Sequence, residues 1–243
     1  IKNGADLLLA SNVFAHADDL KSMAESMKKL VKPEGKIIIE VQYLLNTIKD
    51  LTFDNIYHEH TNYWSLSTLN KFLKSLDLFI FKVERINTHG GSIRAYICQD
   101  ENISIDNSVN QLLAEEEAHG LKKLKTYIDF GKKIQNLKKN VVNNLKKLKK
   151  KHKNIIGYGA PAKATTTLNF FNIKDEIDFI IEDNKLKHEK YMPGVNIPII
   201  AKDKIKLKNP MVLVLAWNFF DEIKKNNKNL AKNFINIKSL EKN

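Results

Sequence analysis

Short apolar runs alternate with stretches of helical periodicity through the first part of the chain. Residues 7–10 and 36–41 are apolar runs of strand length. Between them, Asp18 or Asp19 is placed to cap a helix that continues to Val31 with apolar side chains on one face. Strand, helix and strand in this order predict an α/β fold whose parallel strands are joined by right-handed crossovers.

Pro33, Glu34 and Gly35 predict a turn between the first helix and the second strand.

A further helix and a hairpin follow the second strand. A helix is predicted over residues 66–76, and strands are predicted over 79–85 and 93–98. Two strands so close together are typical of an antiparallel strand that closes one edge of a parallel sheet.

Residues 107–151 carry the longest helical pattern in the chain, with a break near His119 and Gly120. Apolar side chains recur mostly every three or four residues, and lysines fill the positions between them. A helix that is apolar on one side must pack against something, so we expect a connector between two domains. The apolar positions are Leu121, Leu124, Ile128, Ile134, Leu137, Val141, Leu145 and Leu148.

A second α/β pattern begins at Asn154. A short strand, a glycine turn and a helix over residues 162–171 open it, and more strands and one helix follow. This order predicts a small doubly wound domain with its own switch point. The later elements are strands at 177–181, 212–215 and 234–237 and a helix at 219–228. The predicted divisions of the chain are 1–106, 107–153 and 154–243.

The net charge of +12 is concentrated in one segment. Forty lysines and arginines face 28 acidic residues, and residues 121–153 hold 13 lysines and a single acid, Asp129. Such a segment can bind nucleic acid or form the solvated face of an amphipathic helix. It has no arginine for base contacts, and its aromatic residues are limited to Tyr127 and Phe130. We therefore expect a solvated face and no nucleic-acid partner.

The cysteine content and hydropathy of the sequence limit the cellular locations that we expect for the protein. Cys98 is the one cysteine in the sequence, which excludes an internal disulfide and a thiolate-rich zinc site in this stretch. No run of about 18 apolar residues occurs, so we expect no spanning helix and no membrane partner. A reducing cytoplasm is the expected location.

The strongest chemical signal is Tyr57-His58-Glu59-His60, with Tyr63 shortly after it. The surrounding residues 53–65 fit no regular element. Imidazoles, a carboxylate and phenols suit proton transfer near neutral pH, and a neighbouring carboxylate can orient a histidine. A hydrogen-bonded loop that covers the sheet is the structural alternative. Zinc binding by these histidines and Glu59 is a third, although the spacing differs from the helical H-E-x-x-H pattern.

His16 follows the first predicted strand, at the same carboxyl edge as the histidine-rich loop. A lone histidine after a strand often serves structure, but this placement favours a shared site.

Two glycine-containing segments are further candidates. Gly157-Tyr158-Gly159-Ala160-Pro161-Ala162-Lys163 places backbone N–H groups at a helix N-terminus, which suits phosphate or simply a tight turn. A third glycine of the dinucleotide fingerprint is missing. Thr88-His89-Gly90-Gly91-Ser92-Ile93-Arg94 is a hairpin turn or a close-approach loop. Arg94 is one of two arginines, which indicates a need for a fork-shaped donor.

Five segments in order resemble the sugar C-methyltransferases that act on nucleotide-linked deoxysugars and use S-adenosylmethionine. They are Asn12-Val13-Phe14-Ala15-His16, Ile56-Tyr57-His58-Glu59-His60, His89-Gly90-Gly91-Ser92-Ile93-Arg94, Gly157-Tyr158-Gly159-Ala160-Pro161-Ala162-Lys163 and Val214-Leu215-Ala216-Trp217-Asn218-Phe219. The resemblance covers nearly the whole chain.

The resemblance implies three parts: a cysteine-rich zinc domain, a methyltransferase domain and a C-terminal α/β domain. This chain resembles the second half of the central part, a partial class I methyltransferase (Rossmann-like) sheet, followed by connecting helices and the complete third part. Zinc and the glycine-rich cofactor loop would lie outside it. A predicted buried strand so close to Ile1 also leads us to expect further residues upstream.

The resemblance also implies roles for individual residues. His60 resembles the general base, and Glu59, Tyr57 and His16 resemble its active-site partners. Asn12, with Ala10, lies where the family passes the cofactor. No metal site is implied. The expected substrate-binding residues are Tyr63, Arg94, Gly157, Tyr158, Gly159, Ala160, Lys163 and Asn169.

The implied reaction begins at a nucleotide-linked 4-keto sugar, where a base removes the proton beside the ketone and the enolate carbon takes a methyl group. A sugar O- or N-methyltransferase and a non-catalytic nucleotide-sugar or nucleic-acid binding fragment remain alternatives. We expect a monomer.

Overall fold

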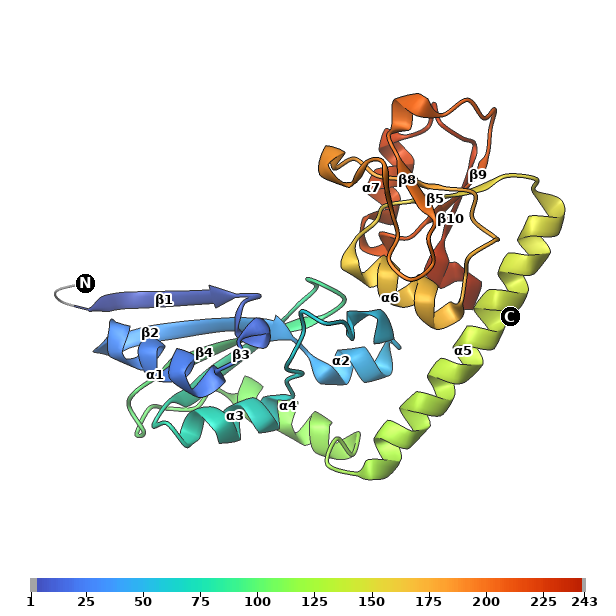
Figure 1. The fold of residues 1–243 in the computed structure, drawn as a ribbon. Helices are drawn as coiled ribbons and strands as arrows, with labels where there is room; N and C mark the ends of the chain where they lie inside the picture. The colour runs from blue at the N-terminus through green and yellow to red at the C-terminus, as the bar shows by residue number, and fades with distance from the viewer. Residues whose placement is uncertain (1–3, 242–243) are drawn as a thin grey trace. The chain divides into compact units, whose positions relative to one another are not determined.

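The computed structural model describes residues 4–241, which form two compact units that divide between Gly131 and Lys132. The boundary along the chain falls within helix α5 (Leu124–Lys151). Each unit is an α/β structure built on its own sheet (Figure 1). The mixed α/β class predicted from the sequence is confirmed.

The first unit contains a four-stranded sheet with the order β1-β2-β4-β3. Its strands are β1 (Ala5–Ser11), β2 (Val31–Gln42), β3 (Phe79–Ile86) and β4 (Ser92–Cys98). β1 and β2 are parallel, and β4 runs antiparallel to both of its neighbours, β2 and β3. The prediction that the antiparallel strand closes an edge is therefore wrong: β4 lies inside the sheet, and β3 forms the edge.

Four helices accompany this sheet: α1 (Leu20–Leu30), α2 (Leu44–Lys49), α3 (Leu66–Lys74) and α4 (Asn107–Ala118). α1, α3 and α4 cover one face (Figure 1). Asp19 caps α1 by accepting the backbone N–H of Ser22, as its sequence position predicts. The core under these helices includes Ile37, Ile39 and Val41 of β2.

Two local predictions in this unit need correction. The turn predicted at Pro33–Gly35 lies within β2, because the register with β1 shifts between Ala5 and Leu7 and the irregular pairing accommodates the extra residues. Helix α2 follows β2 directly and was not predicted, since its six residues are too short to show a helical period.

The predicted break in the long helical segment is confirmed between α4 and α5, where Gly120 has a φ of 67°. The apolar stripe of α5 is buried at Ile134, Leu137, Val141 and Leu145. Leu124 and Ile128 continue the pattern but are exposed. Within residues 4–241, no helix is both long and apolar enough to cross a membrane.

The second unit contains a six-stranded sheet with the order β10-β9-β5-β6-β8-β7. The chain enters at β5 in the middle, moves to one side through β6 and β8, and then returns to the other side through β9 and β10. This reversal is the predicted doubly wound pattern, and it places a switch point at the ends of β5 and β9. β7 alone among these strands runs antiparallel to its neighbour.

The elements of this unit are short. They are β5 (Ile155–Tyr158), α6 (Ala162–Phe171), β6 (Ile180–Ile181), β7 (Lys190–Tyr191), β8 (Pro198–Ile200), β9 (Met211–Val214), α7 (Phe220–Asn226) and β10 (Asn233–Asn236). The strand predicted over 177–181 is limited to β6. Strands β7 and β8 were not predicted, because two or three residues carry no periodicity.

Candidate active site

A cavity of about 250 Å³ lies at the carboxyl ends of β1 and β2, where open α/β sheets bind their ligands. The residues around it come from segments far apart in the sequence: the segment after β1, the histidine-rich loop and the loop before β4. Among its lining residues are Asn12, His16, Tyr57, Glu59, His60 and His89. The structure thus brings together the histidine-rich loop and His16, as their sequence positions predicted.

His60 is buried, and its ring has polar partners on both nitrogens. Nδ1 lies 2.7 Å from the carbonyl oxygen of Asn55, which can only accept a hydrogen bond. Nδ1 therefore carries a hydrogen, and in the neutral ring Nε2 carries the lone pair. The hydroxyl of Tyr57 lies 3.0 Å from Nε2 and donates to that lone pair. A backbone carbonyl thus fixes the tautomer in which Nε2 is the basic atom.

His16 is fixed in the same way. Its Nδ1 lies 2.7 Å from the carbonyl oxygen of Glu59, so Nδ1 donates and Nε2 carries the lone pair. The ring centroids of His16 and His60 are 4.9 Å apart. Two imidazoles in adjacent positions, each held by a backbone carbonyl, make this cavity suited to proton transfer.

The two tyrosines of this loop remain phenols at neutral pH. Burial raises the pKa of Tyr57 above its usual value, and the charge of Glu59 raises it further. Burial also raises the pKa of Tyr63. Tyr57 is therefore a hydrogen-bond donor in the resting site, toward His60.

Glu59 does not orient the candidate base through its carboxylate. Its side chain is more than half exposed and lies 3.8 Å from Nε2 of His58, which is also exposed. The expectation that a neighbouring carboxylate orients His60 is therefore wrong, because the carbonyl of Asn55 performs that task. Among the described residues, no group of histidine, cysteine and acidic side chains is arranged to hold a metal ion, so the zinc alternative has no structural support.

The histidine-rich loop is anchored at its carboxyl end by a buried carboxylate. Glu116 accepts hydrogen bonds from the backbone N–H groups of Leu66 and Ser67, at the start of α3, and from the hydroxyl of Tyr43 after β2. Tyr43 also forms a bridge with Trp64. The loop that carries His60 is thereby tied to the end of β2.

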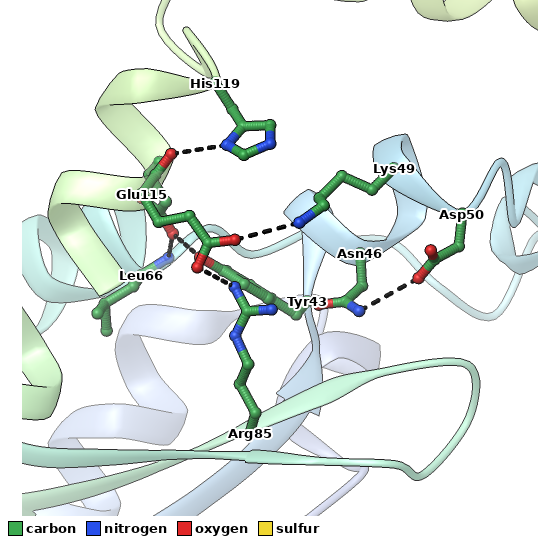
Figure 2. Close-up of polar contacts among 9 residues, drawn as sticks. Tyr43, Asn46, Lys49, Asp50, Leu66, Arg85, Glu115 and His119 are labelled. Atoms are coloured by element: carbon green, nitrogen blue, oxygen red, sulfur yellow. Dashed lines mark hydrogen bonds and ion pairs between the residues drawn. The ribbon is translucent and has the colours of Figure 1, made fainter. Parts of the chain in front are cut away.

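Around this anchor, a second carboxylate joins three elements (Figure 2). Glu115 of α4 lies 2.6 Å from Arg85 of β3 and 3.2 Å from Lys49 of α2. Both cations approach the same carboxylate, Arg85 from β3 and Lys49 from α2, the helix that precedes the loop. Glu116 thus anchors the start of α3, and Glu115 links α4 to β3 and α2.

Ala10 and Asn12, the two residues predicted to bind the cofactor, lie in different surroundings. Ala10 is buried in β1 and belongs to the core of the unit. Asn12 lines the cavity, has a φ of 56°, and donates its backbone N–H to the carbonyl of Glu40 at 2.9 Å. Asn12 is therefore the one of the two whose side chain can reach a ligand there.

Sequence reasoning overlooked two residues of this region, Glu40 and Asn55, and it named His89 only as part of the Thr88–Arg94 segment, without a role of its own. Glu40 is a buried carboxylate bonded to Arg94, the arginine predicted to bind substrate. An acid inside the apolar run KIIIEV was a signal that could have found it. Nothing in the sequence distinguishes Asn55, which acts through its backbone.

The second unit has a larger cavity, of about 520 Å³, at the carboxyl ends of β5, β6 and β9. Gly159 lines it with a φ of 87°, and a Cβ there would lie 2.7 Å from Ala216. Tyr158 donates to both carboxylate oxygens of Asp183 at 2.9 and 3.0 Å. Burial, followed by Asp183, raises the pKa of Tyr158 to about 12.

The glycine turn of this cavity already contacts an acid. The backbone N–H of Ala160 donates to the carboxylate of Glu182 at 2.7 Å, at the position where a phosphate was expected. A side chain added at Gly157 would meet Ile180, so this glycine serves close packing between β5 and β6.

Two other residues predicted to bind substrate lie outside the lining of this cavity. The ammonium of Lys163 lies 5.3 Å from the ring centre of Trp217, and that of Lys238 lies 4.2 Å from it. Asn169 donates to the backbone carbonyls of Thr165 and Pro193. Their roles toward substrate stay predictions.

Comparison with known proteins identifies the family of this chain. A family model described as the C-methyltransferase C-terminal domain matches residues 87–236. The chain belongs to the C-methyltransferase family. The C-methyltransferase NovU of Streptomyces niveus is 31% identical over 232 residues, which cover 94% of this chain and 55% of NovU. The chain therefore spans about half the length of that relative.

Solved structures are more distant. One is a complex with the Trm112 methyltransferase activator of Haloferax volcanii, at 14% identity and a TM-score of 0.34 over 40% of this chain and 56% of that chain. Another is the mitomycin 7-O-methyltransferase MmcR, at 15% identity and a TM-score of 0.32 over 39% and 30%. At these scores, neither likeness adds to the description of the fold.

Proposed function

We propose that this chain carries the proton-transfer site of an S-adenosylmethionine-dependent enzyme that methylates a carbon beside the ketone of a nucleotide-linked 4-keto-deoxysugar. The observation that carries the proposal is the tautomer of His60, whose basic Nε2 is held at a cavity by the Asn55 carbonyl. Family membership supports the methyl transfer to carbon.

The residues of the cavity account for the proton steps. His60 Nε2 takes the proton from the carbon beside the ketone, and the electron pair of the broken C–H bond becomes the enolate. The hydroxyl of Tyr57, released from Nε2 as that atom is protonated, turns to donate to the enolate oxygen. Such a donor is most valuable where charge develops. His16 Nε2 is the second basic atom and receives the proton on its way to solvent.

The cofactor would contact this chain at the carboxyl edge of the first sheet. S-Adenosylmethionine, when bound, supplies the electrophilic methyl group that the enolate carbon takes as the methyl–sulfur bond breaks. Asn12 fits this edge, because it lines the cavity at the end of β1 and its amide can donate or accept. Asn12 would bind and orient the cofactor beside the two histidines.

We assign the nucleotide part of the substrate to the second unit. Its switch-point cavity offers Lys187 and Lys202 as cations and Asp183 as an acceptor for hydroxyl groups. The carboxylate of Glu182 at the Ala160 N–H argues against a phosphate at that amide. An anion would instead depend on the ammonium groups of Lys187 and Lys202, which also donate to the Ala160 carbonyl and to Asn227. The lysine-rich face of α5 is proposed to be solvated rather than bound to nucleic acid, and the protein is proposed to be a monomer of the reducing cytoplasm.

The test replaces the base in the full-length protein. His60→Asn should lower turnover by about 10² to 10⁴-fold, the usual contribution of a general base. It should also abolish exchange of the substrate proton in heavy water, followed by NMR, with an unchanged circular dichroism spectrum. His58→Asn, an exposed neighbour, is the matched control and should leave both signals intact. Turnover within tenfold of wild type in His60→Asn would remove His60 as the base. Methylation of oxygen or nitrogen without proton exchange would overturn the reaction class.

A further inference from the structure

Glu40 is a charged residue in the most apolar strand of the first unit. It lies in β2 between Ile39 and Val41, which point into the core under the helices. Alternation along a strand places Glu40 on the opposite face of the sheet. The side chain is nevertheless buried, with 5% of the residue exposed. A buried carboxylate is costly unless it is paired and hydrogen-bonded, so its partners show what it holds.

Those partners come from three separate segments. Arg94, directly opposite on β4, donates from Nη2 to Oε2 at 3.0 Å. The hydroxyl of Thr88 donates to Oε1 at 3.1 Å, and the amide of Asn12 makes a longer contact of 3.5 Å with the same oxygen. The backbone carbonyl of Glu40 also accepts the N–H of Asn12.

Two of these contacts are next to backbone conformations that side chains rarely adopt. Asn12 has a φ of 56°, and His89, which follows Thr88, has a φ of 52°. Both residues line the cavity that holds His60. Left-handed conformations of residues other than glycine persist when surrounding contacts hold them. Glu40 supplies such contacts to Asn12 itself and to the neighbour of His89.

We propose that Glu40 is a positioning residue, which fixes Asn12 and the Thr88–His89 turn in the geometry that binds the cofactor. Arg94 then acts through Glu40 by balancing its charge, rather than by contacting the substrate. This inference rests on the proposed function for the identity of the ligand. The proposed role of Glu40 differs from a purely structural one, because its carboxylate contacts two segments at the same cavity.

The experiment compares two glutamates on either side of Arg94 in the full-length protein. Glu84 of β3 also lies opposite Arg94 but bonds Tyr96 and Lys82 instead of the cavity loops. Glu40→Gln places an amide among hydrogen-bond donors and should weaken binding of S-adenosylhomocysteine, measured by calorimetry, by about tenfold. The KM for S-adenosylmethionine should rise equally while kcat changes by less than about threefold. Glu84→Gln should change none of these values.

A second pair of variants, both at Thr88, tests the inference if Glu40→Gln does not fold. Thr88→Val should weaken cofactor binding by about threefold, and Thr88→Ser, which keeps the hydroxyl, should restore it. Equal effects of Glu40→Gln and Glu84→Gln, or lowered thermal stability with unchanged affinity, would overturn the proposal. So would a loss confined to kcat, or equal affinities in Thr88→Val and wild type. A wild-type protein that binds S-adenosylhomocysteine but transfers no methyl group would refute the proposed function alone.

Discussion

The cavities of the two units lie at the same kind of place, the carboxyl edge of an α/β sheet, but their polar groups are arranged for different tasks. In the first unit, backbone carbonyls hold two imidazoles so that each keeps a basic nitrogen. In the second unit, carboxylates accept from a phenol and from a backbone N–H. The first arrangement can move a proton, whereas the second can recognise a ligand without reacting. Fold position alone therefore does not separate catalysis from binding.

A tyrosine in each cavity allows a direct test of this contrast. Tyr57→Phe removes the donor that we assign to the enolate and should lower kcat by about 10²-fold, with little change in KM. Tyr158→Phe should leave kcat within about threefold of wild type and raise the KM for the nucleotide sugar. Steady-state kinetics of both variants provides the measurement. Equal losses of kcat in the two variants would show that both cavities take part in the chemistry.

The glycine turn of the second cavity should be sensitive to any side chain. Gly159→Ala combines a φ of 87° with a Cβ only 2.7 Å from Ala216, and it should cost about 2–4 kcal/mol of unfolding free energy. Urea denaturation of the variant and the wild type, monitored by hydrogen exchange of backbone amides in the second unit, measures this loss of unfolding free energy. Unchanged protection of β5 and β9 amides would show that the turn relaxes freely.

The phenol of Tyr158 makes the second unit sensitive to alkali. Its pKa is raised to about 12 from an ordinary value near 10, so the folded state favours the protonated phenol. This contribution to stability is complete below about pH 10 and is lost as the pH rises toward 12. The difference in unfolding free energy between wild type and Tyr158→Phe should shrink across that interval. A difference independent of pH would contradict the shift.

The smallest effect is expected at a residue that lines neither cavity. Gly131 lies exposed within α5, and a Cβ there would meet nothing within 4 Å. Gly131→Ala should therefore stabilise the protein by about 0.5–1 kcal/mol, because alanine has the higher helix propensity. Thermal unfolding of Gly131→Ala and Gly159→Ala, each compared with wild type, shows whether the first substitution stabilises the protein and the second destabilises it. Destabilisation would mean that Gly131 is needed for a bend or a contact of α5.

The order of helices and strands was readable where a periodic pattern was long. The pattern predicted β1, α1, α3 and α6, and the order β5, β6, β9, β10 of the second unit. It missed α2, β7 and β8, which are too short to carry a period, and it misplaced β4, because pairing partners are not written in the local pattern. The resemblance of five ordered segments led correctly to the C-methyltransferase family.

The sequence by itself indicated which residue types could do chemistry: Tyr57, His60 and His16 stood out by residue type and by their place after the first two predicted strands. Tertiary structure decided which partners they have. It replaced the expected carboxylate with the carbonyl of Asn55 at His60, and it engaged the Ala160 N–H with Glu182. It also paired Arg94 with Glu40. A tautomer or an occupied donor depends on distances of about 3 Å between residues that the sequence separates, and no local pattern encodes those distances.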